Sequence, residues 1–454
     1  MELQGKATRI TLNNFKTPQM RAFHLSWFAF FLCFFGWFGL APMLSVIRKD
    51  LGITTDQIVT TNMVAVASTI LMRLMIGWLC DRIGPRLTYT WLLALGAIPV
   101  MLVGFSSSYE TFLLMRMAIG AIGASFVITQ YHTSVMFAPN VVGTANATTA
   151  GWGNLGGGVT QMVMPLVFAA MLTIVGTEAL AWRWAMVVPG VAMLLTAFAY
   201  FLWTQDTPEG SFKELRAAGK MECGSKVSGA FLEACRDYRV WLLFVIYGAC
   251  FGIELLVNSK AALYFADYFD MDMKTAGLIA GLFGLMNIFA RTLGGAFGDK
   301  FGKTFGLSGR VKWLFIALFC EGLALMLFSR MTAIPLIIAA LILFSLFVQM
   351  SEGATYSVVP FINKKALGAV AGIVGAGGNA GAVASMFLFK KNLTGLEWPT
   401  AFFMTGAIVT VCSFLSFGVR FSSQTEEEAL FASRLAMDTS REPQPELVAS
   451  EVGA

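Results

Sequence analysis

Apolar runs of roughly 20 residues, separated by short charged segments, follow one another along almost the whole chain. A helix of that length crosses the hydrocarbon core of a bilayer. With 57% hydrophobic and 13% charged residues, a soluble domain could not hide its apolar surface. We therefore predict an all-α membrane protein with twelve transmembrane helices. The runs lie at residues 23–47, 57–79, 88–106, 111–137, 142–173, 183–204, 238–266, 275–297, 312–329, 334–361, 366–389 and 400–420.

The longest polar interval, residues 205–237, leaves six apolar runs on each side. This division predicts an N-terminal tail, a first six-helix bundle, a central loop, a second six-helix bundle and a flexible polar tail. Their bounds are 1–22, 23–204, 205–237, 238–421 and 422–454. The first run follows a polar stretch and has no small-residue cleavage site, so we expect a retained helix rather than a signal peptide.

The distribution of lysine and arginine predicts the orientation in the membrane. If both termini and the central loop lie in the cytoplasm, the inside segments carry about three times as many basic residues as the outside segments. We therefore expect a multi-pass protein of the plasma membrane or the bacterial inner membrane, with both termini cytoplasmic. These basic loops also account for the net charge of +5, so we expect no nucleic-acid partner.

No pattern in the chain indicates an enzyme. The two histidines, His24 and His132, form no metal-binding constellation, and no nucleophile–base pair is evident. We expect no metal and no cofactor. A Gly-x-Gly-x-x-Gly pattern at 151–156 is typical of dinucleotide sites, but here it lies inside an apolar run with no preceding strand.

The two halves repeat each other. The segment RLMIGWLCDRIG at 73–84 aligns with RTLGGAFGDKFG at 291–302, which pairs Arg73 with Arg291 and Asp81 with Asp299. A second echo pairs GNLGGG at 153–158 with GNAGAV at 378–383. Matching features in matching helices predict two pseudo-twofold-related six-helix halves, as in transporters whose substrate site lies near the bilayer midplane between the halves.

Arg73 and Arg291 are the residues most in need of explanation. Each lies within an apolar run, about 12 Å from the end of its helix. An arginine near the bilayer centre costs about 2.5–3.5 kcal/mol to insert. One explanation is a pair of buried salt bridges, although neither helix carries a carboxylate one turn away. The other is an anion site, because two planar guanidinium forks suit a small planar oxyanion such as nitrate, formate or bicarbonate.

Several motifs carry a family resemblance that covers all twelve runs. GWLCDRIGPR (77–86), its echo GAFGDKFGK (295–303) and RMAIGAIGASF (116–126) resemble motifs of the major facilitator superfamily. AGWGNLGGGVTQMVMP (150–165) and GAGGNAGA (375–382) resemble the paired signatures of its nitrate/nitrite porter family. Their wording is closer to the high-affinity nitrate transporters of algae, plants and cyanobacteria than to the respiratory bacterial exchangers.

The resemblance implies a secondary active transporter that imports nitrate, and also nitrite, by alternating access and in symport with protons. A nitrate/nitrite antiporter and a non-transporting anion receptor on the same scaffold are the alternatives. We expect the partners to be nitrate or nitrite, protons and the lipid bilayer, and a monomer to be functional. Some relatives require a small single-span accessory membrane protein, which this sequence neither demands nor excludes.

The resemblance also implies the residues of the substrate site. Beside the two arginines, the matching positions hold aromatic side chains that flank the anion: Phe38, Phe126, Tyr247 and Phe251. The Gly-Asn stretches supply Gly153 with Asn154 and Gly378 with Asn379. Glycines at this spacing let helices pack closely or let backbone meet a ligand, and each asparagine amide can donate a hydrogen bond to an oxyanion.

Charged residues suggest two further roles. Glu254 and Glu352 lie in apolar runs and are candidates for proton coupling, since a buried carboxylate can carry a proton. Alternatively, Glu254 pairs with Lys260, and Glu352 pairs with Arg116 or another buried cation. Charged contacts between helix ends are expected to latch one state of the transport cycle. The latch candidates are Asp81, Arg82, Arg86, Arg116, Asp299 and Lys300.

Overall fold

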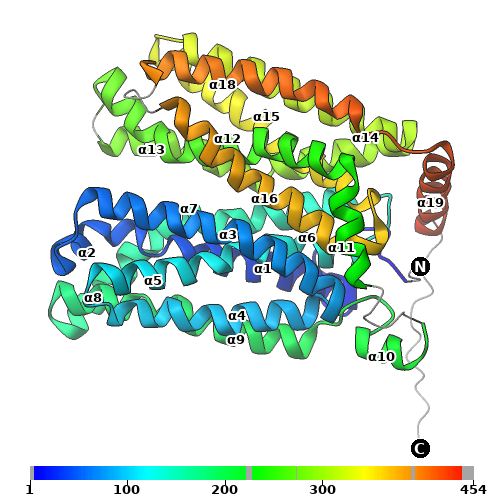
Figure 1. Ribbon diagram of the computed structural model, residues 1–454, viewed down its shortest axis with the longest axis horizontal. Helices are drawn as coiled ribbons and strands as arrows, with labels where there is room; N and C mark the ends of the chain where they lie inside the picture. Colours follow the sequence, from blue (N-terminus) through cyan, green and yellow to red (C-terminus); the bar gives the residue numbers. More distant parts are fainter. Residues whose placement is uncertain (1–4, 221–226, 272, 390–393, 442–454) are drawn as a thin grey trace, which may run out of the picture.

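The computed structural model describes residues 5–220, 227–271, 273–389 and 394–441. Every regular element in these ranges is helical, so the predicted all-α class is confirmed. Two helical layers, one from each half of the chain, lie one above the other (Figure 1). The ribbons lie closest at the end that holds the two termini, here called the terminal end, and diverge towards the opposite end.

The described residues of the N-terminal half form nine α-helices, some of which join into one crossing through short 3-10 turns. The bounds are α1 Pro18–Phe38, α2 Leu44–Leu51, α3 Thr55–Ile83, α4 Pro85–Leu102, α5 Tyr109–Gly120, α6 Ser125–Met136, α7 Val142–Val175, α8 Glu178–Ala185 and α9 Val187–Trp203. The linker between the halves carries α10 Phe212–Ala217 and α11 Val227–Arg236.

The C-terminal half repeats this arrangement with longer helices. The bounds are α12 Tyr238–Phe269, α13 Met273–Leu285, α14 Ala290–Arg330, α15 Ile334–Val358, α16 Leu367–Met386 and α18 Trp398–Ser413. By length and composition, 11 segments of the described chain are able to span a membrane. One of them, residues 275–330, is 56 residues long, or about 84 Å as a helix against a bilayer core of about 30 Å.

That long segment comprises two of the predicted crossings. The backbone leaves helical geometry at Gly306, where φ is 70° and ψ is −157°, a conformation that glycine adopts without the penalty a side chain would bring. The break separates the predicted runs 275–297 and 312–329. The eleven segments therefore account for all twelve predicted crossings.

The polar tail differs from its prediction over part of its length. Residues Ser423–Arg441 form helix α19 instead of a flexible segment. Glutamate, alanine and leucine are strong helix formers, and Glu426 accepts a hydrogen bond from Ser308 in α14 at 3.1 Å, which ties the helix to the terminal end. The remainder of the predicted tail, 442–454, lies outside the described residues.

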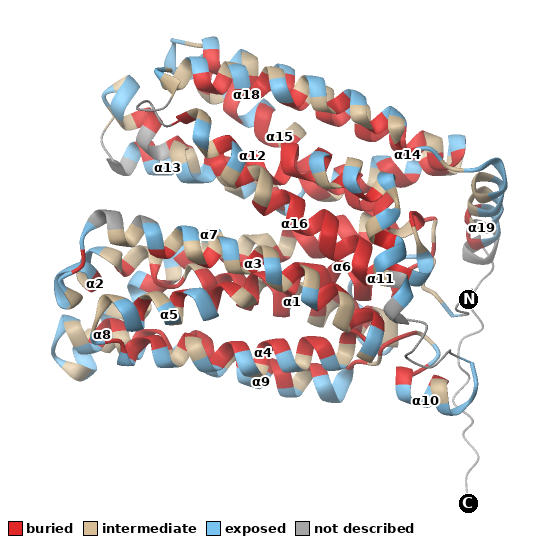
Figure 2. Cartoon of the chain, in the orientation of Figure 1, coloured by how far each residue is buried: buried red, intermediate tan, exposed pale blue. Residues whose placement is uncertain are grey.

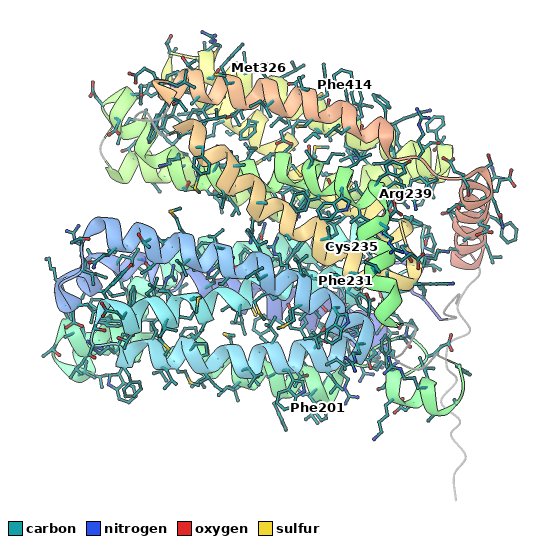
Figure 3. All side chains as sticks on the ribbon, viewed as in Figure 1. Phe201, Phe231, Cys235, Arg239, Met326 and Phe414 are labelled. Carbon is teal, nitrogen blue, oxygen red and sulfur yellow. The ribbon has the colours of Figure 1, made fainter. Side chains whose placement is uncertain are left out.

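The outer surface is apolar, as a membrane protein requires. Exposed side chains such as Leu195 and Val411 lie on α9 and α18, which form the two outer faces (Figure 2). Phe201 and Phe414 lie at opposite outer faces of the molecule (Figure 3) and are 41% and 54% exposed. Exposed apolar surface on this scale marks contact with a partner or with lipid.

Glycines let the two halves touch backbone to backbone at the terminal end. A Cβ atom on Gly77 of α3 would lie 2.3 Å from the carbonyl oxygen of Gly368 in α16. At the symmetry-related contact, a Cβ on Gly295 of α14 would lie 2.1 Å from the carbonyl oxygen of Gly143 in α7. No side chain fits at those distances, so the pseudo-twofold seen in the sequence is also present in the packing between the halves.

Candidate functional site

Arg73 lies in the middle of α3 and is fully buried. Its Nε donates to the carbonyl oxygen of Gly123 at 3.4 Å, and Nη1 donates to the carbonyl oxygen of Gly375, which belongs to the other half. Its Nη2 has no hydrogen-bond partner. Within the described residues no carboxylate forms an ion pair with Arg73, so one buried positive charge has no counter-charge.

Arg291 occupies the related position in α14 and is 1% exposed. It forms an ion pair with Glu352 of α15, and its Nη2 donates to the Tyr247 hydroxyl at 2.8 Å. The salt-bridge explanation therefore describes Arg291 but not Arg73. Inspection of each helix by itself could not reveal this partner, because it comes from another helix.

Aromatic rings join the two arginines. The Arg73 and Arg291 guanidinium carbons lie 5.3 and 5.6 Å from the centroid of the Phe126 ring. Tyr247 and Phe251 stack nearly parallel, with centroids 5.4 Å apart, and both also stack on Phe126. Cation–π contacts of this kind partly stabilise buried guanidiniums without neutralising them.

The amides of the two Gly-Asn stretches are unsatisfied. Asn379 of α16 is fully buried, and neither its Nδ2 nor its Oδ1 has a partner. Asn154 of α7 is half-buried, and its Oδ1 has none. Buried amides are normally hydrogen-bonded, so an unpaired one beside an arginine pair is a place where a polar ligand would complete the bonding.

The glycines of these stretches make room for rings. A Cβ on Gly378 would lie 2.4 Å from the Phe251 ring, and one on Gly153 would lie 1.9 Å from the Phe30 ring. Gly153 and Gly378 therefore allow close helix packing, whereas the asparagines beside them are free to bind.

The two candidate coupling glutamates lie together in the C-terminal half. Glu254 is 2% exposed and accepts a hydrogen bond from the Asn287 amide at 2.8 Å. Because Asn287 precedes Arg291 by about one helical turn, the partners of Glu254 and Glu352 lie close together on the same stretch of chain. The alternative partners are placed elsewhere: Lys260 lies over the Trp398 ring, and Arg116 donates to the Trp37 carbonyl and to Asn62.

Phe38 lies apart from the arginines, whereas two aromatic residues that the sequence analysis did not include lie against the Phe126 ring. Phe38 packs near Gly157 of α7 and Phe34 of α1. Among the described residues, its ring contacts neither the Arg73 nor the Arg291 guanidinium. Tyr356 and Phe30 instead contact the Phe126 ring, with centroids 4.9 and 5.7 Å away. Tyr356 lies one turn beyond Glu352, a spacing that could have drawn attention to it.

At the terminal end, two aspartates cross between the halves. Asp81 at the end of α3 accepts from the backbone N–H groups of Gly368 and Ala369, at 3.0 and 2.9 Å. Asp299 in α14 accepts from the N–H groups of Gly143 and Thr144, at 3.0 and 2.7 Å. Each carboxylate caps the N-terminus of a helix in the other half, where unpaired N–H groups and the helix dipole favour negative charge.

Asp299 has a further partner that the sequence analysis did not include. Arg310 donates to Asp299 at 2.7 Å and to the carbonyl oxygen of Pro139, in the other half, at 2.6 Å. In the second half, this partner comes from beyond the Gly306 break. The reversal of the chain at that glycine brings Arg310 back onto Asp299.

Within the part of the chain that the structure describes, the other latch candidates make no such contact across the halves. Arg82 is exposed and lies over the Trp78 ring, and Lys300 is exposed. Arg86 donates to the carbonyl oxygen of Phe201 and to Ser211 of the linker. Arg116 bonds within the N-terminal half, as described above.

The linker is anchored beside Arg86. Asp206 is 2% exposed and accepts from the N–H groups of Arg86 and Phe212, both at 2.9 Å. Burial raises the pKa of the Asp206 carboxyl above its usual value, although both hydrogen bonds oppose this shift.

Comparison with known proteins agrees with this architecture. The model of the Major Facilitator Superfamily matches residues 26–309 and 256–436. The chain belongs to this superfamily. It is 38% identical to "High affinity nitrate transporter 2.5" of Arabidopsis thaliana over 413 residues, which cover 91% of this chain and 82% of the relative. It is 29% identical to "Nitrate/nitrite transporter NrtP" of Nostoc punctiforme, covering 88% and 92%.

Solved structures show the same fold. The E. coli fucose:proton symporter FucP covers 89% of this superfamily member at 13% identity with a TM-score of 0.65, and this chain matches all of it. The proton:xylose symporter XylE gives 0.66 at 13% identity, covering 91% and 99%. The superfamily and the plant and cyanobacterial relatives are transporters, which confirms the prediction that the chain is no enzyme. No group of three or more metal-ligating side chains occurs among the residues the structure describes.

Proposed function

We propose that this superfamily member imports nitrate, and also nitrite, across the plasma membrane or the bacterial inner membrane. The observation that carries the proposal is the uncompensated charge of Arg73, together with the unpaired Asn379 amide one turn beyond Gly375, whose carbonyl oxygen Arg73 binds. A buried positive charge without a partner is costly, and a bound anion would remove that cost. The names of the plant and cyanobacterial relatives supply the choice of nitrate and nitrite.

The shape of the site favours a small flat anion. The parallel Tyr247 and Phe251 rings and the nearby Phe126 ring leave the guanidiniums in a narrow aromatic box. Within such walls, an arginine edge pairs bidentately with a planar oxyanion. The site uses residues of one chain only, which supports a monomer as the functional unit. Competition by formate and bicarbonate tests how far planarity alone determines selectivity.

We further propose that transport proceeds by alternating access with the terminal end facing the cytoplasm. The Asp81 and Asp299 contacts close that end in this conformation. Both aspartates must leave the N-termini of α16 and α7 before the site can open there. The two contacts are symmetry-related, so they form a paired latch that holds the cytoplasmic end shut until the anion is bound.

Proton symport through Glu254 and Glu352 is the proposed energy source. Import of one anion against an inside-negative potential costs about 2.3 kcal/mol per 100 mV, and accompanying protons offset this cost. The support is structural: Glu352 pairs with Arg291, and Glu254 accepts a hydrogen bond from Asn287, one turn before that arginine. One-for-one exchange of nitrate for nitrite would need no protons and is the competing mechanism.

Reconstitution in liposomes separates these mechanisms. Purified protein should take up labelled nitrate when the outside is acidic, and uptake should fall when the pH gradient is collapsed. Vesicles loaded with nitrite and lacking a pH gradient should show little uptake. Rapid exchange in those vesicles, together with indifference to pH, would make the protein an antiporter. Absence of nitrate uptake under both conditions would contradict the transport proposal itself.

A further inference from the structure

We infer that Glu352 is an internal anion that nitrate must displace from Arg291, and that Glu254, oriented by Asn287, holds the proton that permits the displacement. This inference rests on the proposed function and explains how proton and anion binding are linked at one site. In this scheme Arg73 binds the anion in every cycle, whereas Arg291 becomes available only when the glutamate pair is protonated.

The ion pair is the first support. Arg291 and Glu352 have side chains that are 1% and 0% exposed, so no water screens their attraction. Apart from Arg291, no donor among the described residues reaches the oxygens of Glu352. An anion approaching Arg291 therefore competes directly with the carboxylate, and removing the charge of Glu352 would release the arginine.

The second carboxyl supplies that proton. Two buried ionised carboxylates repel each other, and Glu254 and Glu352 bind side chains one turn apart, so a proton on Glu254 lowers the cost of holding both groups there. With one proton on the pair, the two arginines and the glutamate pair carry one net positive charge, which a single nitrate neutralises. Without the proton the site is already neutral, and a second buried negative charge opposes the anion. The protons of such a pair belong to both groups together.

Asn287 is the positioning residue. It lies one turn before Arg291, and its Nδ2 donates to Oε1 of Glu254 at 2.8 Å. That bond leaves Oε2 of Glu254 without a protein donor among the described residues. Asn287 thereby fixes the orientation of the Glu254 carboxyl.

Several other titratable groups surround the pair, including the buried Glu321. Tyr247 and Tyr356 face the arginines from α12 and α15, and Cys250 lies on the inner face of α12. Arg73 is the only other cation that acts on this aromatic cluster within the described chain. Glu321 of α14 is also fully buried, but it lies near Ser351 and forms no ion pair with either arginine in the structure.

The N-terminal half lacks an equivalent of the pair. Gly156 of α7 packs on the carbonyl of Phe31, and the matching Gly381 of α16 packs on that of Gly248. Phe31 therefore corresponds to Gly248, and counting the same distance along both helices pairs Trp37 with Glu254. Arg73 correspondingly meets the carbonyl groups of Gly123 and Gly375. Carbonyl groups do not titrate, and thus only the arginine of the C-terminal half can be switched by protons.

Proton uptake on nitrate binding tests the inference directly. Nitrate is added to the purified full-length protein in weakly buffered detergent, and the pH change is followed with an indicator dye. We expect wild type to take up about one proton per bound nitrate, with affinity that falls as pH rises. Glu352→Gln should bind nitrate about tenfold more tightly at neutral pH, since no internal anion competes.

Further variants keep the test decisive. The double variant Glu254→Gln/Glu352→Gln should bind nitrate with no proton uptake at any pH, and nitrate should raise its melting temperature more than that of wild type. Asn287→Ala should retain binding but shift its pH midpoint upward. Glu321→Gln is the comparison variant and should keep an uptake of about one proton per nitrate, because Glu321 forms an ion pair with neither arginine in the described residues.

Proton uptake that persists in the double variant would overturn the inference, as would weaker nitrate binding by Glu352→Gln. Either result would leave the proposal of nitrate import standing. That proposal fails separately if the wild-type protein neither binds nitrate nor takes it up into liposomes.

Discussion

Replacing Arg73 by lysine should weaken nitrate binding by about ten- to a hundredfold. The substitution keeps the charge but removes the planar fork that holds the Gly123 and Gly375 carbonyls and still leaves Nη2 free. An ammonium group cannot reproduce those contacts and also present two parallel N–H donors to an anion. A lost hydrogen bond to a charged group is worth about 1.5–3 kcal/mol, which corresponds to one to two decades of affinity.

Isothermal titration of the purified protein with nitrate measures this change, and liposome uptake measures its effect on transport. Arg183→Lys is the matched control. Arg183 also donates to two backbone carbonyls, of Gly104 and Ser106, and pairs with Asp50, but it lies away from the proposed site. The control should bind nitrate as wild type does, and both variants should elute as monodisperse protein.

The reasoning fails if Arg73→Lys binds nitrate within a factor of about two of wild type, a difference of roughly 0.4 kcal/mol. Such a result would mean that Arg73 contributes only charge, or that the anion binds elsewhere. Nitrate binding by Arg291→Lys should depend less on pH than nitrate binding by wild type. A lysine cannot pair with Glu352 and also donate to the Tyr247 hydroxyl in the geometry that Arg291 adopts.

Three more predictions follow from particular contacts. Asn379→Ala should raise the nitrate Kd by about one to two decades while expression stays normal, since this buried amide has no protein partner to lose; unchanged binding would return Asn379 to a packing role. Asp81→Asn should weaken the contact between α3 and α16 at the terminal end by about 1–2 kcal/mol. The distribution of distances between spin labels on the terminal ends of these two helices should then broaden, and an unchanged distribution would exclude the latch. Gly295→Ala should abolish uptake because its Cβ would lie 2.1 Å from the Gly143 carbonyl, while Gly281→Ala, with nothing within 4 Å, should transport normally; equal activities of the two would show that the close approach is dispensable.

The hydropathy pattern alone determined most of the fold. Twelve runs of bilayer length leave few choices for a chain of this composition, since backbone groups in lipid must be bonded within helices. The repeated Arg and Asp positions then placed corresponding helices of the two halves. Arg73 and Arg291 could be singled out because charges are rare in such runs. The helix over 423–441 was harder to predict from the sequence, because so short an amphipathic segment is stable only where it packs on the rest of the protein, here with Glu426 against Ser308.

Only the tertiary structure decided which partners these residues have. Glu352 meets Arg291, and Arg310 meets Asp299, across helices whose relative rotation no local periodicity encodes. The same holds for Asp81 and Asp299, which accept hydrogen bonds from backbone N–H groups of the opposite half. Every residue except proline has such an N–H group, so the sequence does not indicate which ones are used. Hydropathy reports how each helix meets lipid, and repeats report which helices correspond. At the centre, Arg291 pairs with a carboxylate, whereas Arg73 binds only carbonyl oxygens. This charge balance depends on distances between helices that are set only after the halves have packed.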